Sequence, residues 1–142
     1  MKKLSYLLLT ISLSVNAGIT QAIDSVVSTS PEGASVYIIS PVDGETISGP
    51  VHILFGLSGM GVAPAGTVRE NTGHHHLLID GEALPTAGQA MGKDLKHFGG
   101  GQTETKVELP KGKHTLQLIL GNHLHIPHNP PVVSEEITII VE

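Results

Sequence analysis

The chain of 142 residues contains no cysteine and no tryptophan. Without thiols it can form no disulfide, no blue-copper thiolate centre, no cysteine-type structural zinc site and no thiol nucleophile. Aromatic side chains are also scarce, since only Tyr37, Phe55 and Phe98 lie beyond residue 22. Sugar-binding platforms and base-stacking surfaces need more rings than that. These absences exclude several classes of enzyme and of binding protein.

Basic side chains are few, because eight Lys and Arg stand against thirteen Asp and Glu, a net charge of −5 with neutral histidine. Two of the eight, Lys2 and Lys3, lie at the extreme N-terminus, so six basic and thirteen acidic residues remain beyond it, a net charge of −7. This balance disfavours nucleic acid and anionic lipid surfaces as partners and suits the attraction of cations. We expect neither a nucleic acid nor a membrane to bind the mature protein.

Long apolar runs are missing apart from one at the N-terminus. Lys2 and Lys3 precede an apolar stretch from Leu4 to Val15, and Ala22 is a small residue suited to cleavage, with Ala17 as an earlier alternative. The stretch is too short for a permanent transmembrane helix, although a retained N-terminal anchor is the other interpretation. No cysteine follows, which excludes a lipoprotein anchor. We therefore predict a signal peptide over residues 1–22 and export, most simply to a bacterial periplasm.

The rest of the chain shows the alternation and β-branched residues of strands. Strands are predicted over residues 35–40, 51–57, 74–80, 104–109, 114–120 and 137–141. Residues 83–98 come closest to a helical period, but Pro85, Gly88 and Gly92 interrupt it. The pattern predicts an all-β, immunoglobulin-like sandwich of about seven strands, with a small barrel as the alternative. It forms one domain over residues 35–142, after a flexible leader over residues 23–34.

Several short motifs in this domain resemble a known family. They read GMGVAPAG at 59–66, NTGHHHLLID at 71–80, HFGGGQTET at 97–105 and GKHTLQL at 112–118, followed by Gly121-Asn122-His123 and Pro127-His128. Together they resemble the bacterial domain-of-unknown-function family 4399, whose members are short, exported, histidine-rich proteins. The resemblance spans residues 36 to 142 and implies a single periplasmic domain. It implies no activity, so the function has to come from the residues.

Six of the nine histidines form two patterned groups, a triplet at positions 74–76 and a trio at positions 123, 125 and 128. Neutral imidazole is the commonest metal ligand in proteins. Side chains two apart on a strand point the same way, so His74 and His76 can face one ion while His75 faces the opposite side. His123 and His125 repeat this spacing if the backbone is extended there, and His128 follows across Pro127.

Strand topology predicts that the two groups meet. The triplet begins the strand that follows loop 58–73, and the trio lies in the loop between the strands at 114–120 and 137–141. In an immunoglobulin-like sandwich these two loops cluster at the same end. His52 and His114 begin strands at the opposite end, so we assign them no metal role.

We therefore predict a metal site made of His74, His76, His123, His125 and His128. Weaker candidates are His75, as a hydrogen-bonding neighbour, His97, in the long loop 81–103, and Met60. A thioether from Met60 or Met91 would favour Cu⁺, although a single methionine more often fills a gap in the core.

All-nitrogen ligands suit copper, zinc and nickel, and affinity is highest for Cu²⁺, so we rank a copper ion first and a zinc ion second. The predicted role is metal homeostasis or delivery by a monomer, with a periplasmic metalloprotein as its protein partner. Three other interpretations remain open: a metal-dependent enzyme (copper redox or zinc hydrolase), a metal-free module that binds a ligand or protein, and a switch driven by imidazole protonation. A polar end without function is the simplest alternative.

Overall fold

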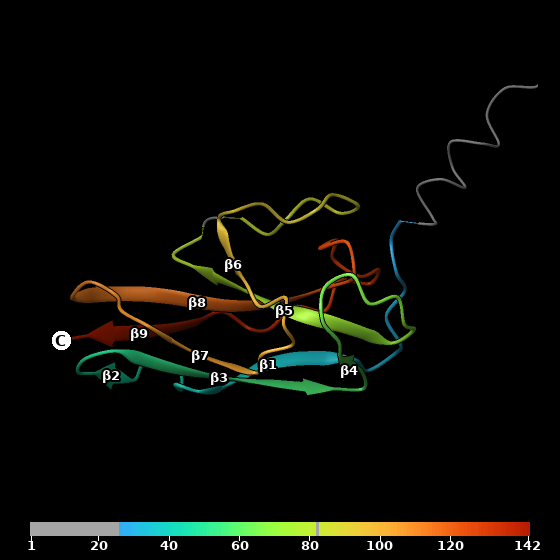
Figure 1. Ribbon diagram of the computed structural model, residues 1–142. Helices are drawn as coiled ribbons and strands as arrows, with labels where there is room; N and C mark the ends of the chain where they lie inside the picture. Colours follow the sequence, from blue (N-terminus) through green and yellow to red (C-terminus); the bar gives the residue numbers. More distant parts are fainter. Residues whose placement is uncertain (1–25, 82) are drawn as a thin grey trace, which may run out of the picture.

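A computed structural model describes residues 26–81 and 83–142 of the protein and shows two β-sheets packed face to face (Figure 1). The predicted signal peptide lies outside the described residues. The described part contains nine strands and no helix. Consequently, no segment of residues 26–81 or 83–142 is a helix that could cross a membrane.

The strands in chain order are β1 (Ser35–Ser40), β2 (Thr46–Ile47), β3 (Val51–Ser58), β4 (Gly61–Val62), β5 (Thr72–Ile79), β6 (Leu95–His97), β7 (Glu104–Val107), β8 (Gly112–Gly121) and β9 (Ile137–Val141). One sheet has the order β1-β3-β7, and the other has the order β2-β9-β8-β5-β4, with β6 also paired to β5. The longer strands correspond to A-B-E facing G-F-C of an immunoglobulin-like sandwich. The predicted fold class is confirmed.

The core lies between the sheets and follows from the alternation of each strand. Val51, Ile53 and Phe55 of β3 face inward, and so do Leu116 and Leu118 of β8; all five are buried. Each such side chain contributes about 1.5–3 kcal/mol by leaving water. Because successive side chains of a strand point to opposite faces, the residues between these inward-facing ones lie on the outer face of the sheet. Alternate residues of β5 and β8 are therefore on the face of the larger sheet away from the core.

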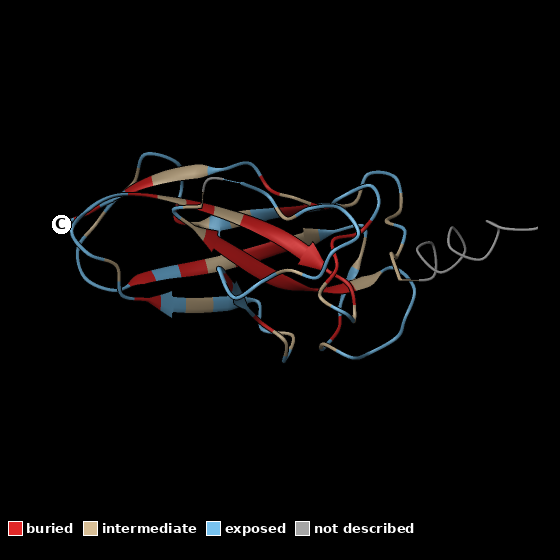
Figure 2. Cartoon of the chain, turned by 90° about the horizontal axis from the view of Figure 1, so that it is seen from above, coloured by how far each residue is buried: buried red, intermediate tan, exposed pale blue. Residues whose placement is uncertain are grey.

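Strand β5 is buried on both faces, and β8 is buried along its second half, as the red strands of Figure 2 show. The outer face of these strands is covered by the loop before β6, which lies on the side of the larger sheet away from β1 and β3 (Figure 1), while β6 itself pairs beside β5. Leu78, Leu95 and Ile119 form a second apolar cluster there, and Met91 packs against it. Side chains on the outer face of β5 are therefore shielded from water.

The described part of the predicted flexible leader, residues 26–34, is held against the loop after β8. The amide of Ser30 donates to the carbonyl of Asn129 at 3.2 Å, and the amide of Asn129 donates to the carbonyl of Ser28 at 2.9 Å. The side-chain amide of Asn122 donates to the carbonyl of Val26 at 2.9 Å. The backbone groups of residues 26–30 therefore find partners in residues 122–130.

His114 of β8 lies at the end of the sandwich away from the predicted metal site. Its ring contacts the residue that follows β5 and the turn that precedes β8. Its Nδ1 lies 2.7 Å from Oδ2 of Asp80, and its Nε2 lies 2.8 Å from the carbonyl oxygen of Pro110. The hydrogen bond to Asp80 is the main reason that the pKa of His114 is raised. Burial opposes ionisation of Asp80, but its hydrogen bonds from His114 and the Thr115 amide outweigh burial and lower its pKa.

The pair should stabilise the fold in a limited pH range. The contribution of His114 is complete below its unfolded pKa of 6.5 and is lost as pH rises through the raised value, and that of Asp80 is lost as pH falls through its lowered value. We expect His114→Gln to cost about 1 kcal/mol at weakly acid pH, a modest figure because the half-exposed Asp80 is screened by water. Urea unfolding of both proteins at about pH 5.5 and pH 9 should show the difference shrinking at the higher pH. A difference independent of pH would contradict the ion pair.

Candidate metal centre

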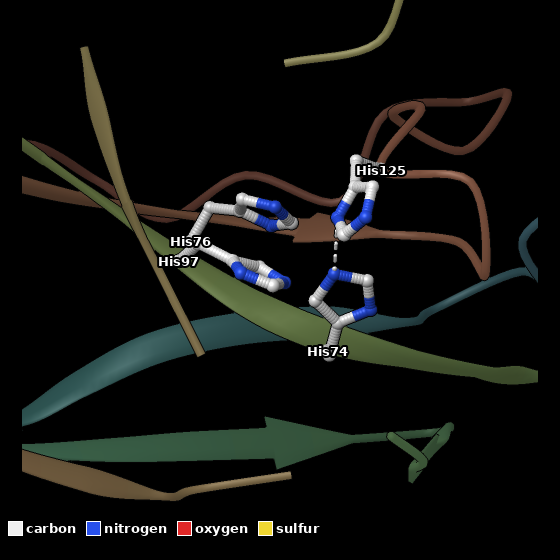
Figure 3. A group of neighbouring side chains, drawn as sticks. All are labelled: His74, His76, His97 and His125. Carbon is white, nitrogen blue, oxygen red and sulfur yellow. Dashed lines mark hydrogen bonds between the residues drawn. The ribbon is translucent and has the colours of Figure 1, made fainter. Parts of the chain in front are cut away.

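Four histidines meet on the outer face of the larger sheet (Figure 3). They are His74 and His76 of β5, His97 at the end of β6, and His125 in the loop between β8 and β9. One ring nitrogen from each residue lies within 4.8 Å of the corresponding nitrogens of the others. We call these four residues the histidine cluster.

The geometry of the strands places the first three members. His74 and His76 are two residues apart on β5, and their ring centroids lie 4.7 Å apart. Antiparallel pairing sets His97 opposite His76, so that the two side chains share a face and their centroids lie 5.2 Å apart. Three imidazoles are thereby positioned by the backbone hydrogen bonds of one sheet.

His125 comes from a tight loop rather than a strand, and its backbone is left-handed with φ of +64°. Such a conformation is unfavourable for a residue with a side chain, so other contacts must hold it. Asn122 supplies them: its Oδ1 accepts hydrogen bonds from the amides of Leu124 and Ile126, and its carbonyl accepts one from the amide of His125. The strained backbone directs the His125 ring toward β5, where its Nδ1 lies 3.0 Å from Nε2 of His74.

The cluster is buried on the β5 side and open on the other. His74 and His76 are buried, His125 is half-buried and His97 is exposed. The Nδ1 atoms of His74 and His76 are buried and have no hydrogen-bond partner. An unsatisfied buried nitrogen costs about 1–3 kcal/mol, and the same cost falls on Nε2 of His75, which faces the core.

Three members of the cluster, His74, His76 and His125, have lowered pKa values and are uncharged at neutral pH. Burial, reinforced by repulsion from neighbouring imidazolium groups, lowers the pKa of His74 to about 4 and that of His76 to about 3. Burial and the proximity of His97 lower the pKa of His125 as well. These rings therefore keep their lone pairs free, which is the state that binds a transition-metal ion.

The structure brings three of the five predicted ligands together and adds a weaker candidate, His97. It does not bring His123 to this group, because the left-handed turn at His125 breaks the extended alternation that would align the two side chains. His123 instead lines a separate surface hollow beside Arg69 and Thr72.

His128 also lies apart from the histidine cluster, because its ring is engaged by the backbone. Its Nε2 lies 3.2 Å from the carbonyl oxygen of Thr72, and its Nδ1 lies 3.4 Å from that of Leu120. His128 is buried where its loop lies against β5 and β8. Its place in the structure is that of a packing residue.

The two remaining weaker candidates point into the sandwich. His75 faces the core, where its ring lies 5.1 Å from that of Phe55 and its Nδ1 lies 3.3 Å from the carbonyl oxygen of Gln102. Met60 packs against the main core. Neither residue belongs to the histidine cluster.

The profile of a family described as a domain of unknown function (DUF4399) matches residues 53–142. The chain belongs to this family. The family match covers all four members of the histidine cluster and β5 to β9 in full, and it confirms the resemblance seen in the sequence motifs. No curated protein and no solved structure matches the chain. The DUF4399 description names no activity, so the chemistry of the histidine cluster is the guide to function.

Proposed function

We propose that this DUF4399 protein binds a transition-metal ion, copper first and zinc second, through the histidine cluster. The observation that carries the proposal is the convergence of four ring nitrogens within 4.8 Å of one another. Four imidazole nitrogens form a donor set that copper and zinc accept. The burial of His74 and His76 supports the proposal, because it keeps both rings neutral and able to bind an ion.

A binding role fits the cluster better than catalysis does. Catalytic zinc sites have three protein ligands and keep the fourth position for water, whereas four ligands from the protein close a tetrahedral site. In such a site the nitrogens lie about 3.3 Å apart, so modest rotation of the rings would close the cluster on an ion. The exposed His97 gives the ion a route in and out. These features favour storage or delivery of the ion.

The cellular part of the proposal rests on the sequence. Export through a signal peptide over residues 1–22 would place the mature protein in the periplasm. There it would act as a monomer in metal homeostasis or delivery, passing its ion to a periplasmic metalloprotein. The acidic balance of the chain suits the attraction of the cation.

Metal retention by untagged protein tests the proposal. The protein is loaded with Cu²⁺ or Zn²⁺, desalted and subjected to elemental analysis. We expect about one ion per chain, falling to less than about a tenth in the double variant His74→Ala/His76→Ala, because two buried ligands are lost.

The matched controls are His114→Ala and His123→Ala, which remove imidazoles outside the cluster. Both should retain about one ion per chain. Circular dichroism establishes that each variant is folded. Wild-type protein that retains no ion, or a folded double variant that retains as much as the wild type, would contradict the proposal.

A further inference from the structure

A donor of a different kind lies next to the histidine cluster. Met91 belongs to the long loop before β6, and its backbone amide donates a hydrogen bond of 2.8 Å to the carbonyl of His125. Its side chain packs against the apolar cluster formed by Leu78, Leu95 and Ile119. Both the backbone and the side chain of Met91 are therefore held on the outer face of the larger sheet, where the histidine cluster lies.

The glycine at the end of β8 shows how close Met91 and the cluster are. A Cβ built on Gly121 would lie 2.5 Å from Cε of Met91 and 2.7 Å from Cε1 of His76. The thioether methyl and the His76 ring thus cover the same glycine, directly across from His74 in the β5–β8 ladder. The sulfur of Met91 is one bond from that methyl, so a soft donor lies beside the His76 ring.

We propose that the Met91 thioether joins the histidine cluster as a ligand and makes copper(I) its preferred cargo. This inference rests on the proposed function and narrows it to one ion and one oxidation state. Thioether sulfur is a soft donor that selects Cu(I), whereas protein zinc sites use imidazole, thiolate and carboxylate ligands. A neutral methionine added to neutral imidazoles would therefore favour the monovalent ion over Zn²⁺.

Met60 provides the matched control, because it packs against the main core between the sheets. Exchange of methionine for leucine nearly conserves volume and usually costs less than about 1.5 kcal/mol. Met91→Leu and Met60→Leu should both fold. The first removes a sulfur beside the histidine cluster, and the second removes a sulfur that packs against the main core.

The test measures Cu(I) affinity by competition with a chromogenic Cu(I) chelator under anaerobic, reducing conditions, and Zn²⁺ affinity by competition with a zinc dye. We expect Met91→Leu to weaken Cu(I) binding at least about tenfold and to leave Zn²⁺ binding within about twofold. Met60→Leu should change neither affinity. X-ray absorption of the Cu(I) complex should show a sulfur neighbour in wild type and in Met60→Leu, and none in Met91→Leu.

The possible failures are distinguishable. Equal Cu(I) affinity of wild type and Met91→Leu, with only nitrogen neighbours in the absorption spectrum, would overturn the role of Met91 and leave metal binding intact. Equal loss of Cu(I) and Zn²⁺ affinity in Met91→Leu would reduce Met91 to a packing residue and also overturn it. Wild-type protein that binds neither ion would overturn the proposed function itself.

Discussion

Saturating Zn²⁺ is expected to raise the melting temperature of this protein by about 10 °C. An ion that binds only the folded state at a hundred times its dissociation constant adds about 2.7 kcal/mol of stability. For a domain of this size, each kcal/mol is worth roughly 4 °C. Calorimetric scans at about pH 7.5 measure the shift under conditions where His74 and His76, with pKa values lowered to about 4 and about 3, are neutral.

The structural reason for the shift is that the folded chain assembles the ligands and the unfolded chain does not. His76 is a buried member of the cluster, with its ring centroid 4.7 Å from that of His74, 5.2 Å from that of His97 and 5.8 Å from that of His125. His76→Ala should therefore abolish most of the zinc-induced shift. His52→Ala is the control, because His52 pairs with Glu104 at the surface and should keep the full shift. An equal shift in wild type and His76→Ala would show that zinc stabilises the protein elsewhere.

The fold could be predicted from the sequence because alternation on a half-buried sheet is a local pattern. The predicted bounds of the strands at residues 35–40 and 137–141 match β1 and β9. Strands β2, β4 and β6 were not predicted, because two or three residues are too few to show alternation. Their pairing with β5 or β9 depends on partners distant in the chain.

The site was predictable where it depends on strand geometry. The spacing of His74 and His76, together with the shared end of the two loops, correctly placed these residues near His125. His97 was the least certain of the four, because its position depends on β6, which has three residues and is too short to show alternation in the sequence.

The loop after β8 could not be predicted, because its conformation depends on a side chain. Asn122 bonds to the amides of Leu124 and Ile126 and also reaches back to Val26, almost a hundred residues earlier. These bonds turn the chain at His125, so the spacing of the trio does not follow an extended strand. The positions of His123 and His128 follow from this turn.

His128→Ala is expected to cost about 2–4 kcal/mol of unfolding free energy and to leave metal binding intact. The buried ring lies between the carbonyls of Thr72 and Leu120 and packs on Gly73, where an added Cβ would lie 2.9 Å from Cε1 of His128. Its removal opens a cavity and takes away the one hydrogen bond that the neutral ring donates to a backbone carbonyl. Urea unfolding measures the cost, and elemental analysis of the desalted protein measures the bound ion.

The comparison that decides the role of His128 is with His123→Ala, which removes a half-buried ring from the same loop. We expect that change to alter stability by less than about 0.5 kcal/mol, because surface substitutions seldom do more. If the histidine cluster is the site, both variants retain about one ion per chain, and only His128→Ala loses stability. A His128→Ala variant that stays stable and loses its ion would make His128 a ligand, which would require the loop to rearrange around the metal.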